Sequence, residues 1–274
     1  MGSAVDIKMM KTGRNFMKMS ITGTSFHKMV LMVTMMALTL AGSTSSAWAS
    51  AAVEAKTTAA VVKNAVAAAP AASIAAAVKK LKSRPQVVFV GAEGTHATVQ
   101  MYGKTQDNHW QEMLSAKADI GKNGLGKTRE GDGKTPVGIF NLKTAFGNKS
   151  NPGTILPYTK VTDQYYWVDD VNSRYYNKMI VKNKAKPDWN SGEHIVDYPI
   201  RYAYAIVVDY NKDCVKGAGS GIFFHCTANR TTSGCIAIPE AAMVDVLRQI
   251  KRGCAMSIDT TANIAAQIKL LTGK

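Results

Sequence analysis

From Gln86 onward the chain is a succession of short apolar runs, and this pattern restricts the fold more than any other feature. The runs are rich in β-branched and aromatic residues, which favour strands, and Gly, Asn and Asp, which favour turns, separate them. Four of these runs are QVVFVGAEG, KMIVK, YAYAIVVDYN and GSGIFFHC. Short strands at this spacing are typical of a β-sandwich or barrel rather than of alternating β and α units. We therefore expect a mainly β domain over residues 86–260.

One helix stands out near the end of this domain, in the run PEAAMVDVLRQIKRG. The run begins at Pro239 and ends at Gly253, and Pro and Gly suit the first turn of a helix and the residue after its end. Apolar residues recur in it at helical spacing; they are Met243, Val244, Leu247 and Ile250. CAMSIDT then predicts a final strand, and residues 261–274 form a tail that could hold a short helix. The sequence thus predicts one or two peripheral helices.

The N-terminus predicts an export signal over residues 1–49. Its first 28 residues carry five basic side chains and one acid, and an uncharged apolar run of 14 residues follows. A membrane-spanning helix needs about 20 residues, so this run is too short for one. Ala47-Trp48-Ala49 then supplies the small-x-small pattern that a signal peptidase cuts. We expect an exported protein in the periplasm, the cell wall or the extracellular space; an uncleaved N-terminal anchor is the alternative.

An alanine-rich stretch over residues 50–85 separates the signal from the β domain. It contains no aromatic residue and is interrupted by Pro70, which predicts a spacer that is partly helical at most. The chain carries a formal net charge of +15. An exported basic protein meets acidic envelope polymers or anionic surfaces, although a solvated lysine surface is the plainer explanation. Because the basic residues are scattered, we expect no nucleic acid partner, and membrane contact only through the signal or anchor.

The segment GKNGLGKT, from Gly121 to Thr128, matches the pattern of a nucleotide-binding phosphate loop. Such a loop needs a helix directly after it, with its N-terminus facing the phosphates. Here the chain continues as REGDGKTPVGIF, whose glycines and proline make a helix unfavourable. We therefore expect no nucleotide but a glycine-rich loop between strands. Lys122 and Lys127 would then meet acidic polymer, and replacing Lys127 should leave catalysis largely intact.

The strongest chemical signal is a histidine and a cysteine ten residues apart, in GSGIFFHCTANRTTSGCIAIPE. His225 lies at or near the end of an apolar strand, and Cys235 precedes another apolar run. An imidazole beside a thiol can take its proton and leave a thiolate, which is the nucleophile. Gly234 permits a tight turn that lets backbone N–H groups face an oxyanion. The alternative is a structural cysteine beside a core histidine.

These residues carry a resemblance to the L,D-transpeptidases of the YkuD type, which remodel bacterial peptidoglycan. The family signature, a strand ending in His, a loop and then [ST]-x-G-C, is similar to His225 followed by Thr232-Ser233-Gly234-Cys235. EGDGKTPVGIF resembles the family's D-G-x-T-P-x-G-x-F element, and the segments 165–177 and 188–194 resemble one branch of it. The chain departs from common members in having Ser233 before Gly-Cys, Ala237 two residues after the cysteine, and a shorter loop.

The resemblance implies a YkuD-like β-sandwich or barrel of mixed sheets and a cysteine acyltransferase. Cys235 would attack the carbonyl of the third residue of a tetrapeptide stem, and His225 would act as the base. The orienting and oxyanion groups would be the backbones of Ser233, Gly234 and Cys226, with the Cys226 carbonyl holding the imidazole. Candidate substrate-binding residues are Asn229, Arg230, Tyr175 and Asp170; the equal alternative is that they belong to solvated polar loops.

The expected partners are peptidoglycan stem peptides, with carbapenem-type inhibitors adding to Cys235, and the resemblance implies neither a metal nor an organic cofactor. Release of D-alanine and transfer to an amine would make a transpeptidase. Water as the acceptor would make an L,D-carboxypeptidase, and a non-catalytic peptidoglycan-binding module is the third option.

A Cys214–Cys254 disulfide is conceivable because each of these cysteines lies beside a strand, but the pairing of Cys214, Cys226 and Cys254 stays open. Their spacing, without C-x-x-C, does not suggest zinc.

Overall fold

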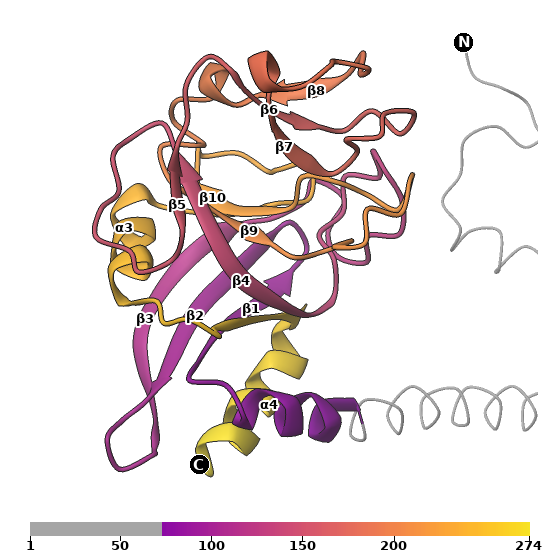
Figure 1. Cartoon of the computed structure of the whole chain (residues 1–274). Coiled ribbons are helices and arrows are strands. Elements are labelled where there is room, and N and C mark those ends of the chain that lie inside the picture. Colours follow the sequence, from indigo (N-terminus) through magenta and orange to yellow (C-terminus); the bar gives the residue numbers. More distant parts are fainter. Residues whose placement is uncertain (1–72) are drawn as a thin grey trace, which may run out of the picture. The chain divides into compact units, whose positions relative to one another are not determined.

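A nine-stranded mixed sheet forms the centre of the structure, a computed structural model that describes residues 73–274 (Figure 1). The predicted signal at 1–49 and the spacer up to residue 72 lie outside the described residues. In chain order the strands of this sheet are β1 (Gln86–Glu93), β2 (His96–Lys104), β3 (Trp110–Asp119), β4 (Gly138–Gly147), β5 (Tyr158–Lys160), β9 (Ala205–Val208), β10 (Phe223–Cys226), β11 (Ile236–Ile238) and β12 (Ala255–Thr260).

Strand β12 gives the sheet its barrel-like form because it pairs on both of its sides. It runs parallel to β1 and antiparallel to β4, while the remaining order is β1-β2-β3-β11-β10-β9-β4-β5. Inward-facing apolar side chains fill the space that the sheet encloses; Val88, Val99, Ile206, Phe224, Ile236 and Met256 are among them, each fully buried. The prediction of a mainly β fold with mixed strand directions is therefore confirmed.

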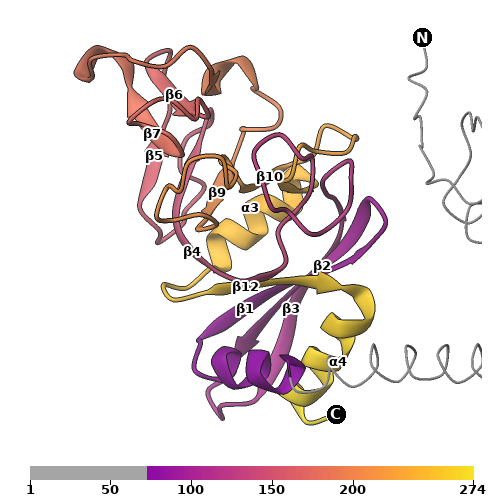
Figure 2. The same cartoon turned by 90° about the vertical axis from the view of Figure 1, so that its right-hand side faces the viewer.

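A second, three-stranded sheet lies at one end of the molecule, as both views show (Figures 1 and 2). Its order is β7 (Lys178–Val181), β6 (Tyr165–Val168) and β8 (Gly192–His194), and two 3-10 turns, η1 (Lys182–Lys184) and η2 (Ile195–Asp197), flank β8 in the chain. The ring of Trp167 in β6 packs edge-on against Phe223 at the start of β10, with ring centroids 4.8 Å apart. This contact attaches the small sheet to the strand that carries His225.

The predicted helix after β11 is α3 (Glu240–Gln249), with Pro239 as the residue before its first turn. It ends four residues before Gly253 because the side chain of Gln86 takes over its last hydrogen bonds. The fully buried Gln86 donates from Nε2 to the carbonyl of Gln249 at 2.9 Å and accepts from the amide of Lys251 at 2.6 Å. The long-range contact therefore overrides the local stop signal.

Two further helical segments cover the face of β1 opposite α3. The tail forms α4 (Thr261–Thr272), which ends at Gly273 in the left-handed conformation that suits a helix C-terminus. Residues 73–82 are also helical, although they belong to the stretch expected as spacer. Val78 and Leu81 of that segment are buried in one cluster with Phe89 and Ile264. The folded body thus begins before Gln86, and three helices pack on the sheet rather than one or two.

Within residues 73–274, none of the helices combines the length and apolar character needed to cross a membrane. The four cysteines are all free thiols, so the proposed Cys214–Cys254 disulfide is wrong. Cys254 lies in the enclosed core, fully buried, whereas Cys214 sits in a turn and directs its thiol toward the carbonyl of Asn177. The two side chains occupy different environments, and lying next to a strand did not bring them together.

Candidate active site

His225 lies in β10, Cys235 directly precedes the adjacent parallel strand β11, and the two side chains share one face of the sheet. In the β10–β11 register His225 lies opposite Ala237, and Cys235 precedes Ala237 by two residues. Residues two apart in a strand point to the same side, so the thiol and the imidazole face the same space. Both are buried, with 8% of Cys235 and 4% of His225 exposed. The loop between them folds the pair together as the sequence analysis expected.

The imidazole of His225 is fixed in one tautomer. Its Nδ1 lies 2.8 Å from the backbone oxygen of Cys226, and a carbonyl can only accept, so Nδ1 carries the proton. Burial lowers the pKa of His225 to about 4, against a smaller opposite effect of the Cys226 bond, so the ring is neutral near pH 7. Its Nε2 therefore holds a free lone pair, which is the form that a general base needs.

The thiol of Cys235 is protonated in the resting structure. It donates to the carbonyl of Gly221 at 3.2 Å and accepts from the amide of Phe223 at 3.3 Å. Burial, followed by the nearby Glu193 carboxyl, raises the pKa of Cys235 to about 12. The nucleophile is thus not a standing thiolate, and it requires a base at the moment of attack.

The segment Thr232–Cys235, called here the nucleophile loop, is tied down by its own side chains. The Thr232 hydroxyl donates to the carbonyl of Cys235 at 2.7 Å and accepts from the amide of Gly234 at 3.1 Å. Gly234 has φ +143°, and a Cβ there would lie 2.7 Å from the backbone oxygen of Lys134. Only glycine fits. Because the Gly234 amide is already bonded inside the loop, it does not point at an oxyanion in this conformation, contrary to expectation.

The glycine-rich loop, Gly121–Thr128, lies against the nucleophile loop. Gly121 and Thr232 form a parallel bridge, and the amide of Lys122 donates to the carbonyl of Thr232 at 2.9 Å. The fully buried Thr135 of the DGKTP element accepts from the Gly121 amide and donates to the carbonyl of Gly234, both at 2.9 Å. The two sequence motifs are therefore one structural unit around the nucleophile. No helix lies between Thr128 and β4, so the order that a phosphate loop needs is not present there.

Lys127 turns inward, which corrects the expectation that it would meet an acidic polymer. Its Nζ pairs with Asp132 at 2.9 Å, and their side chains are only 2% and 6% exposed. Burial opposes ionisation of Asp132, but amides of Thr128, Lys134 and Arg129 and the Lys127 ammonium outweigh it and hold the pKa of that carboxyl well below its usual range. Lys122 is the exposed lysine of this loop.

Two cavities flank the thiol. The first, of about 250 Å³, is lined by residues of the glycine-rich loop, the DGKTP element and the small sheet, among them Lys122, Lys127, Glu130, Trp167, Asp169 and Ser220. The second is smaller and is lined by Arg201, Tyr202, His225, Arg230 and neighbouring loop residues. Three residues line both cavities: Glu193, Ser233 and Cys235. The thiol thus stands where a first and a second cavity meet.

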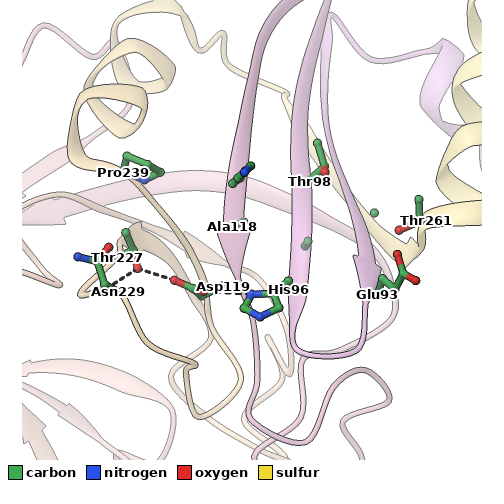
Figure 3. Close-up of a pocket in the computed structure, with 12 residues that line it drawn as sticks. Glu93, His96, Thr98, Ala118, Asp119, Thr227, Asn229, Pro239 and Thr261 are labelled. Carbon is green, nitrogen blue, oxygen red and sulfur yellow. Dashed lines mark hydrogen bonds and ion pairs between the residues drawn. The ribbon is translucent and has the colours of Figure 1, made fainter.

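The structure separates the two loop residues that were predicted to bind substrate. Arg230 lines the second cavity together with His225 and Cys235. Asn229 lines a different, open groove over β2 and β3, where Thr227 donates to Asp119 at 2.6 Å and His96 lies 3.5 Å from the same carboxyl (Figure 3). Only Arg230 is therefore brought to the thiol.

Asp170 and Tyr175 have partners in the region of the small sheet and line neither cavity. Asp170 is 8% exposed and accepts from the amides of Asn190 and Asn172, and these bonds lower its pKa. The ring of Tyr175 packs edge-on against Trp189 at 5.6 Å. This geometry gives both residues a role in shaping the small sheet, and their predicted contact with substrate stays a prediction.

Sequence reasoning missed Glu193, Tyr202, Trp167 and Arg201, all of which line one of the two cavities. Tyr202 packs edge-on against the ring of His225 at 5.5 Å and donates its hydroxyl proton to Glu193. Glu193 lies in the segment 188–194 that resembles one family branch, and that segment was the only available signal. In the described part of the chain, no group of three or more His, Cys, Asp or Glu side chains could hold a metal ion.

Comparison with known proteins gives one family match. A family model described as the L,D-transpeptidase catalytic domain, YkuD, matches residues 94–258. L,D-transpeptidase 1 of Mycobacterium tuberculosis is 14% identical, with a TM-score of 0.31 over 64% of this chain and 62% of that one. A cysteine-to-serine mutant of an L,D-transpeptidase from Enterococcus faecium is 12% identical, with a TM-score of 0.30 over 64% and 50%. This chain spans less than two thirds of either, and such scores support no detailed comparison. No curated protein sequence matches the chain.

Proposed function

The chain belongs to the L,D-transpeptidase catalytic domain family, and we propose that it is an exported enzyme that cross-links peptidoglycan through an acyl-enzyme on Cys235. The donor is a tetrapeptide stem, whose third residue forms the thioester and whose terminal D-alanine leaves. The acceptor is a primary amine of another stem. The signal predicted over residues 1–49 would deliver the domain to the envelope.

One observation carries this proposal: a neutral imidazole in β10 and a protonated thiol directly before the adjacent parallel strand β11 face the same small cavity. The imidazole Nε2 is left free because Nδ1 is bonded to the Cys226 carbonyl. A buried structural cysteine beside a satisfied core histidine would need no cavity on either side of its sulfur.

The proposed reaction has two halves. In acylation, His225 takes the thiol proton as the sulfur attacks the carbonyl carbon, and the backbone amides of Ser233 and Cys235 stabilise the oxyanion. Protonated His225 then gives that proton to the departing amine of D-alanine, which leaves a thioester on Cys235. In transfer, the acceptor nitrogen attacks the thioester, His225 takes its proton and returns it to the sulfur, and an amide results. The cationic Arg230 and Arg201 of the second cavity are suited to the carboxylate of the leaving D-alanine.

The test uses the full chain with tetrapeptide muropeptides and with a carbapenem, followed by mass spectrometry. We expect D-alanine release, dimer formation and one carbapenem adduct on Cys235. Cys235→Ala should lose all three by roughly a thousandfold or more, since it removes the nucleophile. Cys214→Ala, a thiol change away from both cavities, is the matched control and should behave like the wild type. Equal activity of the wild type and Cys235→Ala would refute the proposal.

A further inference from the structure

The two cavities beside the thiol differ in charge. The second cavity presents the guanidinium groups of Arg201 and Arg230 beside His225. The first presents the carboxyl groups of Glu130 and Asp169; of its two lysines, Lys127 is paired with Asp132 and Lys122 is solvent-exposed. Glu193 stands at the junction, next to the sulfur, because it lines both cavities. An anionic group of a substrate fits the second cavity, and a cationic group fits the first.

Glu193 is held in place by the small sheet. In the β6–β8 pairing it lies directly opposite Trp167, so both side chains project from the same face. Trp167 packs on Phe223 and lines the first cavity with Cys235, so that face is the one turned toward β10 and the nucleophile. The Glu193 Oε2 accepts from the hydroxyl of Tyr202, whose ring packs on His225. The carboxyl is thus linked to His225 through Tyr202 and lines both cavities together with Cys235.

The mechanism proposed above leaves one proton unassigned. A primary amine arrives as an ammonium at neutral pH, whereas only the free amine can attack a thioester. His225 handles the proton that leaves nitrogen during attack, and it is neutral, so it has no charge with which to attract the cation. A second base is needed for the first proton, and it must lie within reach of the thioester on the side away from the leaving group.

We propose that Glu193 is the acceptor-binding residue, which pairs with the incoming ammonium in the first cavity and takes its first proton. This inference rests on the proposed function. The Glu193 carboxylate takes a proton from the acceptor's ammonium, which gives a carboxylic acid and a free amine. The free amine then attacks the thioester carbon, and the carboxylic acid of Glu193 later returns its proton to solvent. The amine proton lost during attack passes through His225 to the sulfur.

The surroundings of Glu193 favour a proton-accepting role. Burial raises the pKa of Glu193, and the Tyr202 hydrogen bond opposes this effect. Asp169 and Glu130 raise the pKa further, whereas Arg201 lowers it. A carboxylate of raised pKa accepts a proton from an ammonium more readily than one in solvent does. Water needs no such proton removal as an acceptor, so the residue would favour transfer over hydrolysis.

The test compares two nucleophiles on the same acyl-enzyme of the full chain. One is a stem peptide with a side-chain ammonium; the other is hydroxylamine, which is uncharged at neutral pH. For Glu193→Gln we expect the rate of transfer to the peptide amine to fall about tenfold or more. Transfer to hydroxylamine and carbapenem acylation of Cys235 should stay within about threefold of the wild type. Glu93→Gln, the same change in the outer groove of Figure 3, is the matched control.

Two results would overturn the inference: unchanged transfer to the peptide amine in Glu193→Gln, or an equal fall in all three reactions. Tyr202→Phe provides a second variant in case Glu193→Gln does not fold, because it keeps the ring on His225 and removes only the hydroxyl bond to Glu193. We expect the same selective loss, because the carboxyl loses the hydroxyl that holds it in place, even though removing that bond also removes an effect that lowers the pKa of Glu193. A wild-type chain that neither releases D-alanine nor adds a carbapenem would instead defeat the proposed function.

Discussion

Two glycine-containing loops lie side by side at the candidate active site, and they do different things. The nucleophile loop, Thr232–Cys235, delivers a thiol to the meeting point of two cavities. The glycine-rich loop, Gly121–Thr128, turns its cation inward, where Lys127 pairs with Asp132. One loop presents its chemical group to two cavities, and in the other the cation forms a buried ion pair that holds the loop in shape. The comparison teaches that a motif's letters do not say whether a side chain faces a ligand or a neighbour.

The largest stability effect we predict tests the supporting role of Lys127. Lys127→Met would leave the Asp132 carboxylate buried without its cation, and losing one partner of a buried ion pair costs about 3–5 kcal/mol. Chemical unfolding of the full chain measures this loss. Lys122→Met changes an exposed lysine of the same loop and should cost less than about 0.5 kcal/mol. Similar losses of unfolding free energy in the two variants would show that Lys127 supports the fold no more than the exposed Lys122 does.

The next effect concerns the link between the two loops. Thr135→Val removes the hydroxyl that joins the Gly121 amide to the Gly234 carbonyl and leaves two buried backbone groups unpaired. We expect a loss of about 1–3 kcal/mol in unfolding free energy, together with slower acylation of Cys235 by a carbapenem. Thr135→Ser keeps the hydroxyl and should recover most of the unfolding free energy and most of the acylation rate. If Val and Ser variants acylate at the same rate, the hydroxyl does not position the nucleophile.

The pH dependence tests whether His225 in β10 is the neutral base for Cys235. Because burial lowers the pKa of His225 to about 4, the base should remain active through weakly acidic pH. The rate of carbapenem acylation should fall only as the pH drops through about 4, by about tenfold per pH unit below it. The lowered pKa of His225 also affects folding, because the unfolded chain binds a proton near pH 6.5 and the folded chain only near pH 4. Its contribution to the free energy of unfolding is therefore fully present above about pH 6.5 and is lost as the pH falls from about 6.5 to 4. Rates measured from about pH 3 to 8, with folding checked by circular dichroism, would contradict the buried base if the midpoint lay near 6.5.

The smallest effect separates two neighbours in the loop that precedes the nucleophile. Arg230→Ala should raise the KM for a tetrapeptide donor several-fold, since Arg230 lines the cavity beside His225. Asn229→Gly should leave both kcat and KM within about twofold, since Asn229 faces the outer groove and glycine tolerates its φ of +55°. Steady-state kinetics on one donor distinguish them. Equal effects would mean that the groove and the second cavity act as one binding surface.

Much of the fold could be predicted because it depends on local pattern. The apolar runs became strands, and the run after Pro239 became α3. The prediction failed where a distant group intervened. Gln86, 163 residues from Gln249 in the chain, ends α3 early, and Val78 and Leu81 give an alanine-rich segment enough apolar surface to pack on β1. Such contacts have no periodic signature in the sequence.

The candidate active site likewise contains residues that the sequence could predict and residues that it could not. The spacing of His225 and Cys235 predicted their pairing, and the Cys226 carbonyl lies where the resemblance placed it, 2.8 Å from Nδ1. Their catalytic roles stay predictions until Cys235→Ala is assayed. The segment 188–194 resembled one family branch, but nothing in it singled out Glu193, because a glutamate in a short polar run looks like any solvated acid. Only the pairing of β8 with β6 turns it toward the sulfur.

By itself, the sequence determined the strands, the main helix, the nucleophile candidate and its base, because these follow from side-chain periodicity and from residues close together in the chain. The tertiary structure alone decided that Lys127 is internal, that Thr135 links two motifs, and that Glu193 stands between two cavities. Those outcomes depend on which chain segments meet and how much water they exclude. Burial then changes the cost of a charge, so the same lysine or glutamate becomes a support or a reactive group according to what surrounds it.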